Sequence, residues 1–512
     1  AAAAVEPYSE SEAGIIRNGV FAALPDAFGI SLGYTNDPTT FKNRSTPAPS
    51  TRSMACKAQT SGRIYLHSGP RTELHEIIRQ EYARHQDRAV PRNTLRQAVQ
   101  GMLDTFAYQN FDAAAGEYTN RCCRPPRETE MRPWRLVTEI GWTGGGVLAY
   151  PLVLCRDALG ADAEAPLAAA MSGEQLFDRI ADAYNENSGL LNDLMAPNAA
   201  GSQVNGWWTG YGLVKDCHCA YTVGSAVHYL TKTMDYLHQN GKPCPAKWMD
   251  AAQKVLHTVM DLQRADGAFG YTYSTQERKV LDWSGFAGCW FAPALVYLYR
   301  LTGEERCLHS AEKALDYYHT FVKDLNCYGT PMDTWKAVDE EGNLAFMRGS
   351  RLLYEQTGKA EFLQYMKDSA GYEFLWRYGY KTYPEHTPLN QGWSACGGAV
   401  TSVSNPHIHP MGVIIDTDLR YLARVTGDGY YASRAADSAA WMLQCLELYP
   451  AATGYGRYGI LSERWCPSDG LDVERFSDGR PFSSWFSHNL WASACVLEAA
   501  CELLLEIEHK KG

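Results

Sequence analysis

The sequence predicts an all-α protein in which six helical hairpins close into a toroid, the (α/α)6 architecture. Three observations lead to this fold class. Apolar residues recur at helical spacing, at i, i+3, i+4 and i+7, through most of the chain. The same Thr-Gly connection ends three of the helices. Six long connections alternate with short ones, as expected for an array of hairpins.

Thirteen stretches after residue 70 carry the helical pattern. They are residues 71–85, 92–109, 144–158, 174–187, 220–239, 246–264, 286–302, 306–323, 343–357, 360–377, 411–426, 430–448 and 487–508. The 512-residue chain is long enough to bury a large core, and its apolar fraction of 45% is ordinary for a globular protein. We therefore assign residues 71–512 to one toroid.

The short connections share a sequence signal. Gly303, Gly358 and Gly427 each follow a threonine, and each ends one helix and opens the next. Glycine is favoured directly after a helix because it adopts the left-handed conformation without strain. These connections predict a repeated helical hairpin.

Residues 1–70 differ from the rest of the chain. They are rich in Pro, Thr, Ser and Gly and lack helical periodicity, and segments 29–34 and 63–67 have the composition of strands. The segment is predicted to be an N-terminal arm or a small β-element beside the toroid.

The long connections are predicted to hold the functional site. They cover residues 124–143, 189–219, 265–285, 324–342, 378–410 and 449–486. Loops longer than about 12–15 residues in compact domains are usually functional. Because short and long connections alternate, all six long loops should lie at one end of the toroid.

Motifs in the middle of the chain resemble a known family. They are Gln263-x-x-Asp266-Gly267-Ala268-Phe269-Gly270, Gly285-Phe286-Ala287-Gly288 and Ala294-Leu295-x-x-Leu298-Tyr299-x-x-Thr302-Gly303. This pattern is similar to the six-hairpin glycosidase superfamily, which includes glucuronidases and unsaturated glucuronyl hydrolases, and whose barrel sugar epimerases share. The resemblance covers about residues 140–505 and implies the toroid fold and carbohydrate chemistry. It matches no catalytic motif residue by residue.

Five carboxylates in the long loops are the candidate catalytic residues. Glycoside hydrolysis needs two carboxyl groups beside the scissile bond, and an acid among aromatic rings has the raised pKa that this chemistry requires. The five are Glu139, Asp216, Asp282, Asp333 and Glu463. Each has a structural alternative, a helix N-cap or a loop ion pair, and the cap is a specific alternative for Asp282.

Aromatic, histidine and arginine side chains in the same loops are the candidate substrate contacts. Tryptophan rings suit the half-apolar faces of sugars. Arginine binds carboxylates in a bidentate fork, which suits a uronic acid, although a structural ion pair is an equal alternative. The candidates are Trp142, Trp207, Trp208, Trp283, Trp393, Asn405, His407, His409, Arg348 and Arg464, with Arg457 as a further arginine.

Composition excludes several other classes of protein. The net charge of −11 argues against nucleic acid as a partner. No apolar run reaches the roughly 18 residues of a membrane span. The odd count of 15 Cys favours a reducing, cytoplasmic compartment, although a chain whose signal peptide has been removed would look the same. The spacing of Cys217, His218 and Cys219 does not fit a zinc site, so neither a metal nor a cofactor is expected.

The leading functional hypothesis is a glycoside hydrolase that acts on uronic-acid-containing oligosaccharides or polysaccharides. A polysaccharide lyase would use Asn405 with His407 or His409, a tyrosine and an arginine on the same toroid. A sugar epimerase would need paired histidines at the centre of the cleft. A non-catalytic sugar-binding toroid is the fourth alternative. The sugar, the linkage, the stereochemistry and the oligomeric state are not determined by the sequence.

Overall fold

The computed structural model describes most of the chain after residue 67 and short strands before it. The described residues are 2–5, 8–11, 14–17, 19–24, 27–32, 58–59, 62–65, 68–85, 88–123, 132–135, 138–160, 170–198, 200–207, 214–330, 332, 336–381, 394–402, 405–446, 448, 459, 461–463, 465 and 486–509. All structural statements below refer to these residues.

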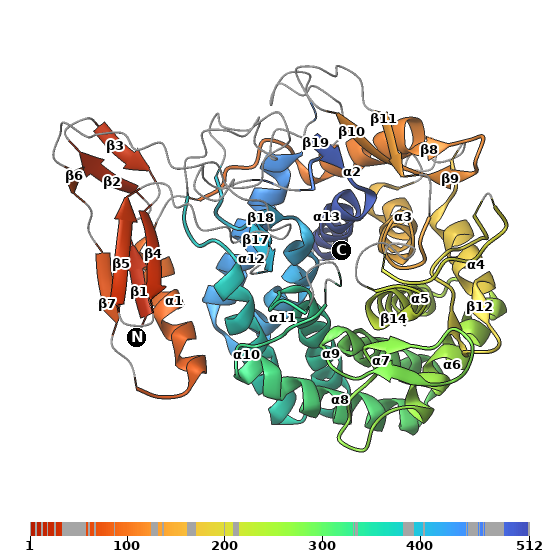
Figure 1. The fold of residues 1–512 in the computed structure, drawn as a ribbon. Coiled ribbons are helices and arrows are strands. Elements are labelled where there is room, and N and C mark those ends of the chain that lie inside the picture. The colour runs from red at the N-terminus through yellow and green to blue at the C-terminus, as the bar shows by residue number, and fades with distance from the viewer. Residues whose placement is uncertain are drawn as a thin grey trace.

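Thirteen α-helices form the body of the described structure, which confirms the all-α prediction (Figure 1). They are α1 Leu74–Arg84, α2 Leu95–Thr105, α3 Gly146–Leu159, α4 Gly173–Asp182, α5 Ala220–Gln239, α6 Ala246–Asp261, α7 Phe291–Thr302, α8 Glu305–Lys323, α9 Glu341–Thr357, α10 Ala360–Trp376, α11 Asp416–Thr426, α12 Gly429–Cys445 and α13 Leu490–His509. Shorter helical turns are η1 Arg71–Glu73, η2 Phe106–Asn110, η4 Ala287–Trp290 and η5 Met411–Ile415.

Six of these helices form the inner ring of the toroid. Around the ring they follow the order α3, α5, α7, α9, α11, α13, and α13 packs against α3 to close it (Figure 1). The outer helices α4, α6, α8, α10 and α12 each follow an inner helix and pack on it. The sixth pair of helices consists of α13 and α2, which are far apart in the sequence and pack against each other. Inner helix α5 is almost wholly buried, whereas the outer helices α6 and α8 are amphipathic.

The Thr-Gly connections owe their recurrence to one hydrogen-bond arrangement. At Gly303, Gly358 and Gly427 the φ angles are 73°, 65° and 72°, so each glycine occupies the left-handed region. The preceding threonine hydroxyl donates to the carbonyl four residues earlier and accepts the N–H two residues later. For Thr302 these distances are 2.8 and 3.2 Å. The predicted hairpin signal is therefore confirmed at all three positions.

Short strands complete the fold and lie mostly in the long connections. They are β1 Ala2–Val5, β2 Tyr8–Ser11, β3 Gly14–Arg17, β4 Gly19–Leu24, β5 Ala27–Leu32, β6 Ala58–Gln59, β7 Gly62–Tyr65, β8 Phe111–Asp112, β9 Glu117–Tyr118, β10 Asn120–Cys123, β11 Arg132–Arg135, β12 Tyr184–Asn185, β13 Leu190–Leu191, β14 His218–Cys219, β15 Thr272–Tyr273, β16 Val280–Asp282, β17 Ala399–Ser402, β18 Asn405–His409 and β19 Phe486–His488. In Figure 1 the strands β1–β7 lie outside the ring, beside α1. The division of the chain near residue 70 remains a prediction.

One predicted helix is too long. Residues 183–187 belong to the antiparallel hairpin β12–β13, in which Asn185 pairs with Leu190, and not to the helix expected over 174–187. The Asn185 side chain accepts the N–H groups of Asn187 and Ser188, which starts a turn, and Gly189 completes it with a φ of 74°. This local hydrogen bonding competes with the helix and ends it.

The six long connections meet at one end of the toroid, as predicted. We number them loop 1 (106–145), loop 2 (183–219), loop 3 (262–290), loop 4 (324–340), loop 5 (377–415) and loop 6 (446–489). Each loop is joined to the next by backbone pairing. The residues that pair through their backbones, in order around the ring, are Ile140–Asp193, His218–Tyr273, Phe286–Tyr328, Glu340–Thr401, Ile408–Trp465 and Arg121–His488. We call this end of the toroid the loop end.

A buried carboxyl group at the start of α9 makes the stability of the fold depend on pH. Burial raises the pKa of Asp339 to about 7, although the N–H groups of Thr330 and Gly342 donate to its carboxyl oxygens. An unfolded aspartate has a pKa of about 3.9. Between these values the folded state binds a proton that the unfolded state has lost, so stability falls as the pH rises.

Replacing Asp339 by asparagine is therefore expected to weaken this pH dependence. The stabilising contribution of the protonated carboxyl is complete below about pH 4 and is lost as the pH rises to about 7. Urea midpoints measured across this range should fall less steeply in Asp339→Asn than in the parent. Asp324→Asn, which changes an exposed aspartate after α8, is the control. An unchanged slope in Asp339→Asn would contradict the assignment.

Candidate active site

A continuous arc of aromatic rings lines the centre of the loop end. Trp142 stacks on Trp491 with ring centroids 4.9 Å apart, and it contacts Trp207 at 5.4 Å. Trp207 stacks on Tyr221 at 5.4 Å, and Tyr221 contacts Trp290 at 5.6 Å. The rings come from loops 1, 2 and 3 and from the first turns of α5 and α13. We call these five residues, together with His409, the aromatic arc.

His409 extends the arc on its far side. Its ring stacks on Trp491 with centroids 5.9 Å apart. Strand β18 holds it there, because His409 pairs with Ala399 of β17. Residues 405–409 form this strand, while the side chains of Asn405 and His407 lie outside the described structure. All six rings of the arc are buried.

The Glu341 carboxylate lies at the middle of the ring of inner helices. It lies close to the Tyr221 hydroxyl of α5, which donates to the Met411 sulfur at 3.5 Å, and its negative charge also acts on the Cys495 thiol of α13. A group on α9 that reaches both α5 and α13 must lie near the axis of the toroid. The side chain of Glu341 is only 4% exposed. Burial and Glu341 together raise the pKa of Tyr221 well above its usual value, so this tyrosine stays a neutral donor.

A second buried carboxyl group, Asp193, lies beside Trp207. Burial raises its pKa well above the usual range, and the negative charge of Glu139 adds to the shift. The backbone N–H of Gly206 donates to its Oδ2. A raised pKa favours the protonated form of a carboxyl group, which is the form a general acid requires.

Glu139 is held next to Asp193 by the turn that follows it. Its backbone N–H donates to the Thr143 carbonyl at 3.1 Å, and residue 139 pairs with Leu194 of loop 2. The turn is tight, because a Cβ atom on Gly145 would lie 2.0 Å from the Glu139 carbonyl oxygen. The same turn places Trp142 in the arc. Glu139 and Trp142, both predicted, therefore lie where the site was expected.

Replacing Gly145 by alanine is expected to destabilise the protein. The added methyl group meets two backbone carbonyls, of Glu139 and Ile140, and neither can move without opening the turn. We expect a loss of about 1–3 kcal/mol in the free energy of unfolding, measured by urea denaturation. Gly429→Ala, where a Cβ meets open space at the start of α12, should cost nothing. Equal effects of the two substitutions would contradict this packing.

Glu463 lies at the beginning of α13, close to Trp491. The Asn489 side-chain amide donates to the Glu463 carboxylate, and Asn489 immediately precedes the helix. Loop 6 is fixed there by the pairing of Trp465 with Ile408. Glu463 thus belongs to the same end of the toroid as Glu139, and its predicted role in catalysis remains a prediction.

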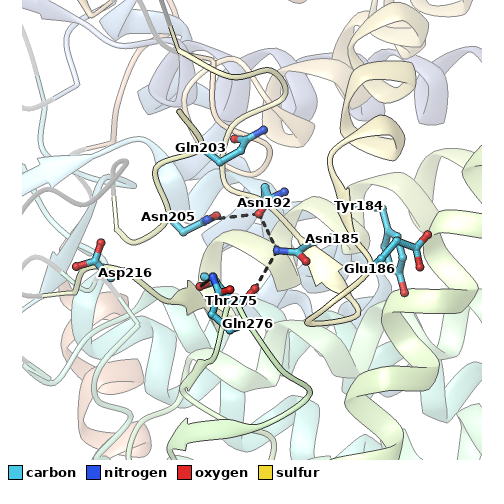
Figure 2. Close-up of a pocket in the computed structure, with 9 residues that line it drawn as sticks. All are labelled: Tyr184, Asn185, Glu186, Asn192, Gln203, Asn205, Asp216, Thr275 and Gln276. Carbon is cyan, nitrogen blue, oxygen red and sulfur yellow. Dashed lines mark hydrogen bonds between the residues drawn. The ribbon is translucent and has the colours of Figure 1, made fainter. Parts of the chain in front are cut away.

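Three other predicted residues lie away from the arc. Asp216 lines a polar pocket between loops 2 and 3 (Figure 2). Asp282 accepts the N–H of Ser284 and forms an ion pair with Lys336 at 2.7 Å, so it shows the loop ion pair considered for all five carboxylates and not the helix cap considered for Asp282 in particular. Trp283 lies on the rim, where Arg264 covers its ring at 5.2 Å.

Arg348 differs most from the expectation. It lies two turns inside α9 rather than in a loop, and only 6% of it is exposed. Its Nε donates to Asp418 at 2.8 Å and its Nη2 donates to the Ile414 carbonyl at 3.0 Å. These partners favour the structural ion pair over contact with a substrate. The remaining candidates lie outside the described residues: Trp208, Asp333, Trp393, Arg457 and Arg464.

Sequence reasoning missed the residues that the fold brings to the centre. Tyr221, Trp290 and Trp491 lie in the first turns of helical segments and read as core positions in the sequence. Glu341 belongs to the run Asp339-Glu340-Glu341, three consecutive acids in front of a predicted inner helix. Three consecutive acids in front of a predicted helix were a usable signal in the sequence. The structure buries all three of their carboxyl groups. No group of three or more His, Cys, Asp or Glu in the described structure could hold a metal ion.

Comparison with known proteins identifies the fold. No family model and no curated protein matches the sequence. Among solved structures, a family 76 glycoside hydrolase from a bovine Bacteroides thetaiotaomicron strain matches with a TM-score of 0.52 and 11% identity, over 88% of this chain and 81% of the other. A cellobiose 2-epimerase from Spirochaeta thermophila matches with a TM-score of 0.51 and 11% identity, over 85% and 99%. A D-mannose isomerase also matches at 0.51 and 11%, over 80% and 97%.

These likenesses confirm the class of fold that the motifs predicted. The chain shares the (α/α)6 toroid fold of these solved structures. At 11% identity they show the fold alone, and they do not select one reaction. Within the described structure, no helix combines the length and the apolar composition that a membrane span requires.

Proposed function

We propose that the protein is a glycoside hydrolase whose active site lies at the aromatic arc, with Glu341 and Asp193 as its principal carboxyl groups. The observation that carries the proposal is the position of Glu341, a buried carboxyl group near the axis of the toroid and next to Tyr221 of the aromatic arc. A family 76 glycoside hydrolase is among the solved structures of this fold.

The two carboxyl groups would divide the chemistry by their protonation states. Asp193 is the general acid, because burial raises its pKa and so favours the protonated form that can donate to the leaving oxygen. Glu341, next to Tyr221, is the base or nucleophile, a role that its carboxylate form would carry. The aromatic faces of the arc suit the apolar face of a sugar ring. Glu139 and Glu463 are the reserve candidates for either role.

The nature of the sugar is the least supported part of the proposal. Uronic-acid recognition was expected from arginines, but Asp418 already binds Arg348, and Arg464 lies outside the described residues. Uronic-acid-containing oligosaccharides therefore remain a substrate class to test beside neutral ones.

A sugar epimerase or isomerase is the second candidate, and His409 favours it. This histidine stacks on Trp491 in the arc, and enzymes named for both reactions are among the solved structures of the fold. The lyase alternative rests on Asn405 and His407, whose side chains are not described, together with His409.

One substrate screen separates these reactions. The protein is incubated with aryl glycosides, neutral oligosaccharides and uronic-acid oligosaccharides, and the products are analysed by mass and absorbance. Hydrolysis adds one water per cleaved bond and frees a reducing end, which is the expected result. A lyase would give an unsaturated product that absorbs in the ultraviolet. An epimerase would leave the mass unchanged. Binding without any turnover would contradict an enzymatic role.

A further inference from the structure

A polar pocket of about 550 Å³ lies between loops 2 and 3, at the edge of the loop end (Figure 2). Its volume is within the range of small-molecule sites, about 300–1,000 Å³. Its lining residues are nearly all polar: Tyr184, Asn185, Glu186, Asn192, Gln203, Asn205, Asp216, Thr275 and Gln276. Nothing in the proposed chemistry uses this pocket.

The three asparagine carboxamides that line the pocket are held in fixed orientations. Asn192 Oδ1 accepts from Asn185 Nδ2 at 3.2 Å and from Asn205 Nδ2 at 3.4 Å. Asn185 Nδ2 also donates to the Thr275 carbonyl at 3.1 Å. Both bonds to Asn192 use its oxygen, which leaves its NH₂ group to donate elsewhere. A carboxamide offers both donors and acceptors, and so it matches sugar hydroxyls, which do the same.

The charge of the pocket selects against an acidic ligand. Glu186 and Asp216 both line it, and no Lys, Arg or His is among its lining residues. A uronate placed here would meet two carboxylates, which is unfavourable, because Lys254 lies behind the wall, over the Tyr184 ring at 5.1 Å, and is not among the lining residues. A neutral, hydroxyl-rich ligand meets no such penalty.

A short backbone segment connects the pocket with the aromatic arc. Asn205 Oδ1 accepts the N–H of Asp193 at 2.9 Å, and the Asn205 carbonyl accepts the N–H of Asp216 at 2.9 Å. Gly206 donates to the Asp193 carboxyl, and Trp207 of the arc follows directly. Residues 205–207 thus hold both the wall of the pocket and the proposed general acid, Asp193. An oligosaccharide that reaches Asp193 has this pocket beside it.

We propose that this pocket is a distal subsite for a neutral sugar unit of an oligosaccharide substrate. The inference rests on the proposed function, because it takes the scissile bond to lie at the aromatic arc. It restricts the proposed substrate to oligosaccharides that place a neutral sugar in this pocket, whatever sugar binds at the aromatic arc.

Binding of oligosaccharides of two lengths tests the subsite without relying on turnover. Dissociation constants are measured by calorimetry for cellobiose and cellotetraose, for mannobiose and mannotetraose, and for tetragalacturonate. The protein carries Glu341→Gln so that the ligands stay intact. We expect a neutral tetrasaccharide to bind more tightly than its disaccharide, and Asn192→Ala to weaken the tetrasaccharide about five- to tenfold, the effect of one lost hydrogen bond.

Two further variants keep the result interpretable. Gln276→Ala removes an exposed carboxamide from the same pocket and should also weaken the tetrasaccharide, even where Asn192→Ala lowers the folded fraction. Gln356→Ala changes a carboxamide in a pocket at the opposite end of the toroid, and should leave all constants unchanged.

Three outcomes would overturn the subsite. They are tetrasaccharide affinity that neither Asn192→Ala nor Gln276→Ala alters, tetragalacturonate binding as tightly as the neutral chains, and no binding of any neutral chain. Loss of the proposed function looks different. If neutral chains bind as expected but the parent protein never hydrolyses them, the subsite survives and the glycoside hydrolase does not.

Discussion

Replacing Glu341 by glutamine is expected to lower the rate of glycoside hydrolysis about 10²–10⁴-fold, the usual contribution of a positioned acid or base. The substitution keeps the size of the side chain while removing its charge. The effect should fall on kcat more than on KM, because the lost interaction acts mainly on the transition state. Initial rates on the best substrate of the screen measure it.

The control for this substitution is Glu361→Gln. Glu361 is an exposed glutamate in the first turn of α10, so its replacement changes the same chemical group without touching the arc. Thermal unfolding curves of both variants should match the parent. Hydrolysis by Glu341→Gln at the parent rate would remove Glu341 from the mechanism and leave Glu139 and Glu463 as the carboxylates to test.

Replacing Lys232 by methionine is expected to cause the largest loss of stability. Lys232 lies on α5 with 5% of its side chain exposed and bridges Glu498 and Glu502 of α13, the latter at 2.8 Å. Its ammonium group also lies 4.2 Å from the centre of the Tyr150 ring of α3. One cation thus joins three consecutive inner helices across the point where the ring closes.

Removing this cation leaves two buried carboxylates without their shared partner. Breaking a buried ion pair in this way costs about 3–5 kcal/mol, whereas an exposed pair is worth about 0–1 kcal/mol. Urea denaturation should show this difference between Lys232→Met and Lys247→Met, since Lys247 pairs with Asp182 on the surface. Neutralising both glutamates as well, in Lys232→Met/Glu498→Gln/Glu502→Gln, should recover part of the loss. Equal effects of the two lysine substitutions would contradict this account.

The helical part of the fold could be predicted from the sequence because its signals are local. Apolar spacing located thirteen helices, and the glycines after Thr302, Thr357 and Thr426 marked three hairpins through their left-handed conformation. The helix ends were less predictable. Residues 183–187 continue the apolar pattern, but the turn made by the Asn185 side chain overrides it.

The candidate site could be predicted only in part, because its members meet through ring closure. Glu139, Trp142, Trp207 and His409 stood out as unusual residues in long loops, and they do lie at the loop end. Tyr221, Glu341 and Trp491 come from three different inner helices, and only the closed ring brings them together. Arg348 was expected to contact the substrate because it lies near a long loop in the sequence. In the structure it pairs inside the barrel with Asp418, which is 70 residues away in the sequence.

The position of a bound oligosaccharide tests the central claim most directly. A crystal structure of Glu341→Gln with a substrate from the screen would locate the sugar relative to the toroid. The account predicts a sugar ring against the aromatic arc at the loop end, with its glycosidic oxygen near Asp193. Sugar bound at the opposite end, where the short Thr-Gly connections lie, with the arc unoccupied, would contradict it.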